Sequence, residues 1–134
     1  MQGIKIAARY RDGALVKGTT HNFTPQGPSF HVLPTGQGSA ARPTKIRLTE
    51  LKAVFFVDSY EGNPAYEESK KFDPLDGRQG QRLSVIFEDG ESIVGTVYEY
   101  NPSSIGFFLF PADSQANNQK VFVVNASVNH VKAA

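Results

Sequence analysis

One set of turn and core residues occurs twice in this chain of 134 residues, and it limits the fold more than any single motif does. The matched pairs, each 77 residues apart, are Asp12 and Asp89, Gly13 and Gly90, Gly18 and Gly95, Pro25 and Pro102, Phe30 and Phe107, Pro34 and Pro111, Leu51 and Val128, and Val54 and Val131. Glycine and proline each determine a backbone geometry, and the apolar residues mark core positions. Their shared spacing therefore predicts a duplicated structural unit.

The unit is predicted to consist of strands. Residues 4–11 alternate between apolar and polar or small side chains, which is the period of a half-buried strand, and Asp12-Gly13 then supplies a tight turn. Gly18 lies inside the next strand, where glycine marks a bend or a close approach of backbones. The expected strands are 4–11, 15–23, 30–33, 45–48, 52–57, 83–87, 91–100, 106–110, 120–124 and 127–131.

The repeat divides the chain into residues 1–57, a connector at 58–81 and residues 82–134. The connector is rich in charge, proline and glycine, and we expect at most one helical turn there, at Pro64–Lys71. Short strands joined by turns are typical of a small barrel or sandwich. The all-β fold is either two small barrels in tandem or one larger barrel to which each half contributes strands.

Two segments carry a family resemblance, residues 9–18 (Arg-Tyr-Arg-Asp-Gly-Ala-Leu-Val-Lys-Gly) and residues 86–95 (Ile-Phe-Glu-Asp-Gly-Glu-Ser-Ile-Val-Gly). Each resembles the Sm-like small β-barrel, a relative of the SH3-like barrels. The resemblance implies two tandem barrels and a capacity to bind single-stranded RNA. Sm-type RNA sites also need a late Arg-Gly or Lys-Gly dipeptide, which residues 45–49 and 122–125 lack. The uridine pocket of that family therefore does not transfer to this chain.

Residues 51–62, 106–111 and 117–124 are similar to an uncharacterised bacterial domain that occurs alone or attached to signalling modules such as PilZ. This resemblance implies a regulatory role. A PilZ-type cyclic-dinucleotide site would need an Arg-rich tether and an Asp/Asn-x-Ser-x-x-Gly strand, and the sequence contains neither.

Charge and polarity differ between the two copies. Residues 1–57 carry a net charge of +6, whereas residues 58–81 and 82–134 carry −3 and −2. This asymmetry indicates an anionic partner for the first copy, or attraction between the copies. The candidate ligand-binding residues are Arg9, Lys17, His21, His31 and Arg47. Four of them match Ile86, Val94, Tyr98 and Phe108 of the second copy. The alternative is that these side chains simply face solvent.

The second copy has an aromatic cluster of its own. Residues 106–110 break the apolar–polar alternation, and an unbroken apolar strand is covered on both faces. We expect one face to meet the first copy or another copy of the chain. The candidate interface residues are Tyr98, Tyr100, Phe107, Phe108 and Phe110.

The residues for catalysis are sparse. There is no cysteine, His21, His31 and His130 lack metal-ligand spacing, and no Gly-x-Ser-x-Gly motif occurs. We therefore expect neither an enzyme nor a metal or other cofactor. No apolar run approaches the roughly 18 residues of a membrane span, and no signal peptide is evident. A cytoplasmic location is expected.

The function expected from these features is a non-catalytic binding or regulatory module, mediating protein–protein contact in bacterial signalling. Its partner is another protein or a second copy of the chain. The alternative is binding of single-stranded RNA through the basic first copy.

Overall fold

The structure is a computed structural model, and it describes residues 3–36, 42–60, 72, 79–113 and 117–134. In these ranges ten antiparallel strands form a single open sheet with almost no helix, which confirms the all-β prediction. The strands are β1 (Ile4–Tyr10), β2 (Leu15–Thr20), β3 (Ser29–Pro34), β4 (Thr44–Arg47), β5 (Leu51–Val57), β6 (Gln81–Phe87), β7 (Ser92–Val97), β8 (Gly106–Pro111), β9 (Asn118–Val124) and β10 (Val128–Ala133).

The offset of 77 residues extends to the strands themselves. β1 and β6, β2 and β7, and β3 and β8 match in both bounds, and β4 matches the last four residues of β9. Two short 3-10 helices that the sequence analysis did not predict also match, η2 (Leu48–Glu50) and η3 (Asn125–Ser127). We call β1–β5 the first repeat and β6–β10 the second repeat.

The second strand of each repeat is shorter than predicted, ending at Thr20 and Val97 instead of residues 23 and 100. In the first repeat, side chains replace the ladder beyond this point. Thr20 Oγ1 donates to the carbonyl of His31 at 2.8 Å, and Asn22 Oδ1 accepts from the His31 amide at 2.9 Å. The backbone of residues 21–23 is therefore not needed for pairing and leaves the sheet.

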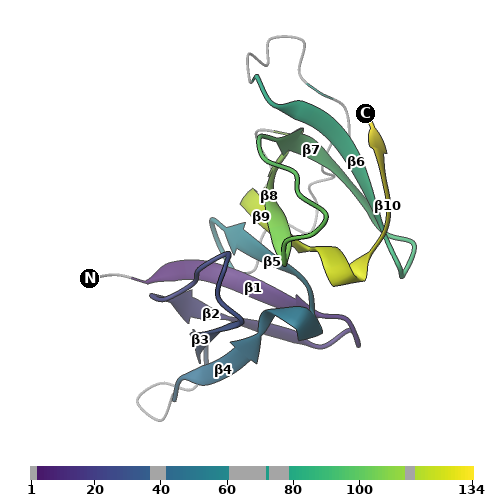
Figure 1. The fold of residues 1–134 in the computed structure, drawn as a ribbon. Helices are drawn as coiled ribbons and strands as arrows, with labels where there is room; N and C mark the ends of the chain where they lie inside the picture. The colour runs from purple at the N-terminus through teal and green to yellow at the C-terminus, as the bar shows by residue number, and fades with distance from the viewer. Residues whose placement is uncertain (1–2, 37–41, 61–71, 73–78, 114–116) are drawn as a thin grey trace.

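The strand order is β10-β6-β7-β8-β9-β5-β1-β2-β3-β4, so the two repeats join where β5 pairs with β9. Figure 1 shows the two groups of strands meeting at this junction. Val54 lies opposite Phe122 and Ala53 lies opposite Val123. The strands left at the two ends of the sheet are β4 and β10.

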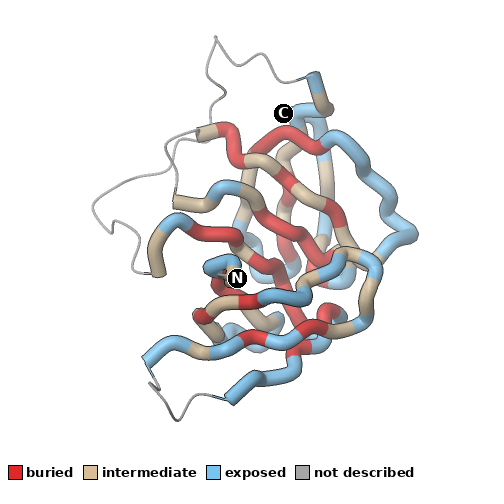
Figure 2. The backbone as a smooth tube through the Cα atoms, turned by 90° about the vertical axis from the view of Figure 1, so that its left-hand side faces the viewer, coloured by how far each residue is buried: buried red, intermediate tan, exposed pale blue. Residues whose placement is uncertain are grey.

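Two apolar cores lie on opposite faces of the continuous sheet. The first core contains Ile6, Phe30 and Val54 of the first repeat, together with Phe122 of the second. The second core is built on the second repeat and includes Ala53 of the first. The buried segments are concentrated in the middle of the sheet (Figure 2). Each repeat therefore completes its core with side chains from the other.

Glycines that occur at matching positions of the two copies have the same structural role in each repeat. Gly13 and Gly90 have φ of 96° and 90°, in the left-handed region that glycine tolerates. A Cβ at Gly18 would lie 2.2 Å from the carbonyl oxygen of Leu33, and one at Gly95 would lie 2.3 Å from that of Phe110. Both strands therefore approach their neighbours too closely for any other residue.

Most of the connector lies outside the part of the chain that the structure describes, including the helical turn expected at Pro64–Lys71. Among the described residues, no helix has the length and apolar character needed to cross a membrane.

Candidate binding surface

Basic side chains occupy one face of the sheet in the first repeat. Residues directly opposite each other in a sheet point to the same side, and the register pairs Ala7 with Lys17, Thr19 with Leu33, and His31 with Lys45. Alternation along each strand adds the remaining members. The set, called the basic face here, is Lys5, Arg9, Lys17, His31, Lys45 and Arg47.

The apolar pattern of the strands determines this arrangement. Ile6 and Ala8 in β1, Phe30 and Val32 in β3, and Ile46 in β4 are buried in the first core. Because successive side chains alternate between faces, the basic residues between them must point outward. The predicted ligand residues Arg9, Lys17, His31 and Arg47 therefore all lie on the outer side of these strands.

No carboxylate offsets this charge within the four strands, since β1–β4 contain no Asp or Glu. None of the basic face residues forms an ion pair with a described carboxylate. Lys17 Nζ instead donates to the carbonyl oxygen of Tyr60 at 2.6 Å, and Lys5 Nζ lies 5.7 Å from the centre of the Tyr60 ring. The face is therefore positively charged and suited to an anionic ligand.

The predicted residues His21 and His31 line a cavity of about 260 Å³ beside the basic face, together with Asn22 and Pro43. Asn22 Oδ1 accepts from the His31 backbone amide, so its amide nitrogen faces the ring and lies 3.1 Å from His31 Nδ1. That nitrogen donates to Nδ1, which leaves the proton of the neutral ring on Nε2. His31 Nε2 is therefore a hydrogen-bond donor, and Lys45 lies directly opposite His31 in the sheet.

Three of the same positions in the second repeat, Phe108, Phe122 and Val124, are apolar and lie against the first core, whereas Lys5 matches Arg82. Phe108 and Phe122, which match His31 and Lys45, pack edge-to-face at 5.2 Å. Both also contact Phe23 of the first repeat, with ring centres 6.2 and 5.3 Å apart. The face that is basic in the first repeat is thus used in the second repeat to hold the two repeats together.

The five aromatic residues predicted at an interface have separate environments. Phe107 is buried in the second core, and Phe108 packs against the first. Tyr98 and Tyr100 are 53% and 38% exposed, and their rings pack against Phe110 and Phe107. A cleft of about 420 Å³ lies beside these rings, lined mainly by the second repeat, including Tyr98, Phe108 and Lys120, and by Pro25 of the first.

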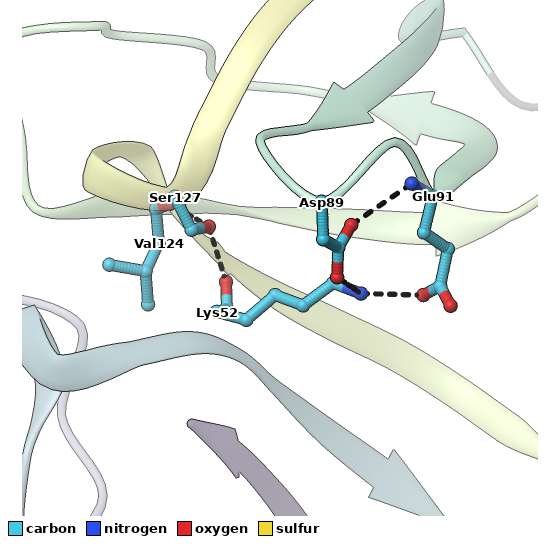
Figure 3. A network of polar contacts seen from close by, with 5 residues as sticks. All are labelled: Lys52, Asp89, Glu91, Val124 and Ser127. Atoms are coloured by element: carbon cyan, nitrogen blue, oxygen red, sulfur yellow. Dashed lines mark hydrogen bonds and ion pairs between the residues drawn. The ribbon is translucent and has the colours of Figure 1, made fainter. Parts of the chain in front are cut away.

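A lysine that the sequence analysis did not select also connects the repeats. Lys52 in β5 has a side chain only 7% exposed, and its Nζ lies 2.8 Å from Asp89 and 2.9 Å from Glu91 (Figure 3). Ser127 Oγ donates to the Lys52 carbonyl at 2.8 Å. The available signal was a charged residue at the start of the apolar run 51–57.

Burial lowers the pKa of Lys52, but hydrogen bonds and charge from Asp89 and Glu91 outweigh it, so the pKa is raised above its ordinary value. The hydrogen bond from Lys52 is the main cause of the lowered pKa of Asp89, followed by the bond from the Glu91 amide. Both groups are therefore charged across the neutral pH range. The cluster therefore joins the two repeats through charged groups.

A metal centre is not assembled in the described ranges. No three His, Asp or Glu side chains converge there to hold a metal ion. In those ranges, Thr96 Oγ1 is the single buried side-chain polar atom without a hydrogen-bond partner.

The structure thus defines an internally duplicated all-β protein. The outer face of the first repeat is basic, and apolar residues at matching positions of the second repeat form the contact between the repeats. The family model described as "Family of unknown function (DUF6982)" matches residues 5–134, and the chain belongs to that family. No curated protein and no solved structure matches this chain.

Proposed function

We propose that this protein is a non-catalytic binding module whose basic face binds an acidic segment of a partner protein. The observation that carries the proposal is the complete absence of carboxylates from β1–β4, combined with a register that points five Lys and Arg side chains to one side. A face of one charge sign attracts and orients an oppositely charged partner. The resemblance to a bacterial domain attached to signalling modules supports a regulatory use of this contact.

An acidic protein segment suits the basic face better than single-stranded RNA does. Single-strand binding normally combines cations with aromatic rings on which bases stack. Phe30 is 1% exposed, and Phe23 is packed against Phe30, Phe56 and Phe122. Phe23 and Phe30 are therefore not available to bases, and the ring that does lie at the basic face, Tyr60, is already in contact with Lys5.

We also propose that each repeat is a small barrel of the Sm-like or SH3-like type. Both repeats have the same strand order, β5-β1-β2-β3-β4 and β10-β6-β7-β8-β9, and each is built around a core of its own. The single larger barrel has less support, because β4 and β10 are at opposite ends of the sheet.

The test is a fluorescence-anisotropy titration with labelled polyglutamate, run beside a mixed single-stranded RNA pool at low and moderate salt. The double substitution Arg9→Glu and Lys17→Glu reverses charge on the basic face and should weaken polyglutamate binding at least tenfold. Lys132→Glu, on the exposed part of β10, is the matched control and should bind as the wild type does.

Binding of RNA but not of polyglutamate would replace the acidic protein partner by a nucleic acid. No binding of either probe at low salt would overturn the proposed function.

A further inference from the structure

β4 is an edge strand whose counterpart in the second repeat is not. Among the described residues, β4 pairs only with β3, whereas the matching part of β9, residues 121–124, pairs with β8 on one side and β5 on the other. This position in the fold therefore accepts an antiparallel strand. In the first repeat the corresponding row of backbone amide and carbonyl groups has no neighbour among the strands that the structure describes.

The β5–β9 junction supplies a register for such a strand. Ala53 lies opposite Val123 and Val54 lies opposite Phe122. The residues of β4 that match Val123 and Phe122, 77 positions earlier in the chain, are Ile46 and Lys45. The residue in the place of Val54 would face Lys45, and the residue two positions before it would face Arg47.

The side chains at these positions define what the added strand must carry. Lys45 and Arg47 lie on the basic face, and both are exposed. Ile46 lies between them on the opposite face and is buried. Opposite charges directly across a strand pair are favourable, and like charges are unfavourable. A complementary strand therefore has carboxylates at two alternate positions and a small residue between them, as Ala53 is in β5.

We infer that β4 takes up an extended acidic segment of a partner protein as an added antiparallel strand, with the pattern acidic–small–acidic placed against Arg47, Ile46 and Lys45. This inference rests on the proposed function and specifies where on the basic face the partner binds. Main-chain hydrogen bonds to the edge supply affinity, and the alternate side chains supply specificity.

A second copy of the chain does not fit this edge. In the same register β10 would place Val131 opposite Lys45 and Asn129 opposite Arg47, so neither cation would meet a carboxylate. His130 would lie opposite Ile46, where the junction has Ala53. The charge pattern therefore selects a partner other than β10.

The experiment uses the full chain and labelled eight-residue peptides, with binding measured by anisotropy. One peptide has a central Glu-Ala-Glu flanked by Thr and Val, and the second has the same composition with the two glutamates adjacent. The alternating peptide should bind at least fivefold more tightly, because only its carboxylates reach both cations. The double substitution Lys45→Glu and Arg47→Glu should abolish that preference, while Lys132→Glu should retain it.

Backbone pairing is tested separately with two N-methylated forms of the alternating peptide, methylated at odd or at even positions. A strand added to β4 donates only alternate amides to it, so one form should lose binding and the other should retain it. Amide hydrogen exchange at residues 44–47 should slow when the peptide is bound.

Equal binding of both N-methylated forms, or of the alternating and adjacent-glutamate peptides, would overturn strand addition at β4. If polyglutamate binding were then still lost in the Arg9→Glu and Lys17→Glu variant, the proposed function would stand without this inference.

Discussion

The β5–β9 junction and the two open edges are built from equivalent strands, and yet they have opposite chemistry. At the junction, Phe122 of the second repeat enters the first core and Phe55 of the first repeat packs against the second core. The residues 77 positions away, Lys45 and Lys132, lie on the open edges β4 and β10. The two positions that hold aromatic side chains at the junction therefore hold lysines at the two ends of the sheet.

The difference shows how a duplicated module can keep one apolar junction and prevent the same apolar pairing at its open edges. Edge strands that carry lysine are protected against uncontrolled strand pairing. The ionic contact is also confined to the junction, because Lys52, Asp89 and Glu91 correspond to Asn129, Asp12 and Ala14. The free edges thus lack both the apolar and the charged parts of the contact.

The largest expected effect is at the apolar centre of the junction. Phe122 is fully buried and contacts Phe23 and Phe108. Phe122→Ala removes a large buried ring, which lowers the free energy of unfolding by about 3–5 kcal/mol. Its counterpart Lys45→Ala should change it by less than about 0.5 kcal/mol. Denaturant titrations of both variants measure the difference, and equal losses would mean that the junction and the edge are energetically alike.

The second effect concerns the two sides of the lysine contact. The double substitution Asp89→Asn and Glu91→Gln leaves the Lys52 ammonium charged and only 7% exposed, so the free energy of unfolding should fall by more than it does when the charge itself is removed. Lys52→Met removes the buried charge itself and leaves two half-exposed carboxylates in water, so the loss should stay near 1 kcal/mol. Chemical denaturation of both variants measures the two losses. A larger loss for Lys52→Met would contradict the view that the unpaired Lys52 charge is what destabilises the protein.

A third effect appears as a dependence of stability on pH. The pKa of Asp89 is lowered from 3.8, so its contribution is complete above that value and is lost as pH falls through the lower folded pKa. The pKa of Lys52 is raised from 10.5, so its contribution is complete below that value and is lost as pH rises through the folded pKa. The free energy of unfolding should therefore fall on both flanks of a plateau.

Asp89→Asn should reduce the fall on the acid side. Asp12→Asn is the control, because the Asp12 carboxylate accepts the same type of turn hydrogen bond, from the Ala14 amide at 2.9 Å, without an ion pair to a described lysine. An acid flank that Asp89→Asn leaves unchanged would show that the lysine contact does not contribute to it.

Much of the fold was predictable because glycine, proline and alternating apolar residues act locally. The turn at Asp12-Gly13 and the close approach at Gly18 follow from these residues alone. The early end of β2 at Thr20 was not predictable, since it depends on a side-chain bond from Asn22 to the backbone of another strand.

The candidate site was predictable only in part. Alternation placed Arg9 and Lys17 on an outer face, but the contribution of Lys45 depends on the β3–β4 register, which aligns it with His31. Lys52 was missed because its carboxylate partners are 37 and 39 residues away, in the other repeat. Long-range pairing of this kind leaves no local pattern in a single sequence.

The smallest effect on the free energy of unfolding, and the most direct test of the comparison, comes from giving the open edges the residues of the junction. Lys45→Phe and Lys132→Phe together place aromatic side chains at the positions of Phe122 and Phe55. Both sites are exposed, so the unfolding free energy of the monomer should change by less than about 0.5 kcal/mol. The new edges are complementary head to tail, and contacts of this type form rings or open filaments.

Light scattering at two protein concentrations should therefore show association of the double variant that increases with concentration. The wild type and each single variant, which retain one lysine edge, should keep one mass at both concentrations. If the double variant keeps the mass of the wild type, the lysines are not what closes the edges. The missing Lys52 contact would then be the next candidate, tested by adding Asn129→Lys and Ala14→Glu to restore its equivalents beside Asp12.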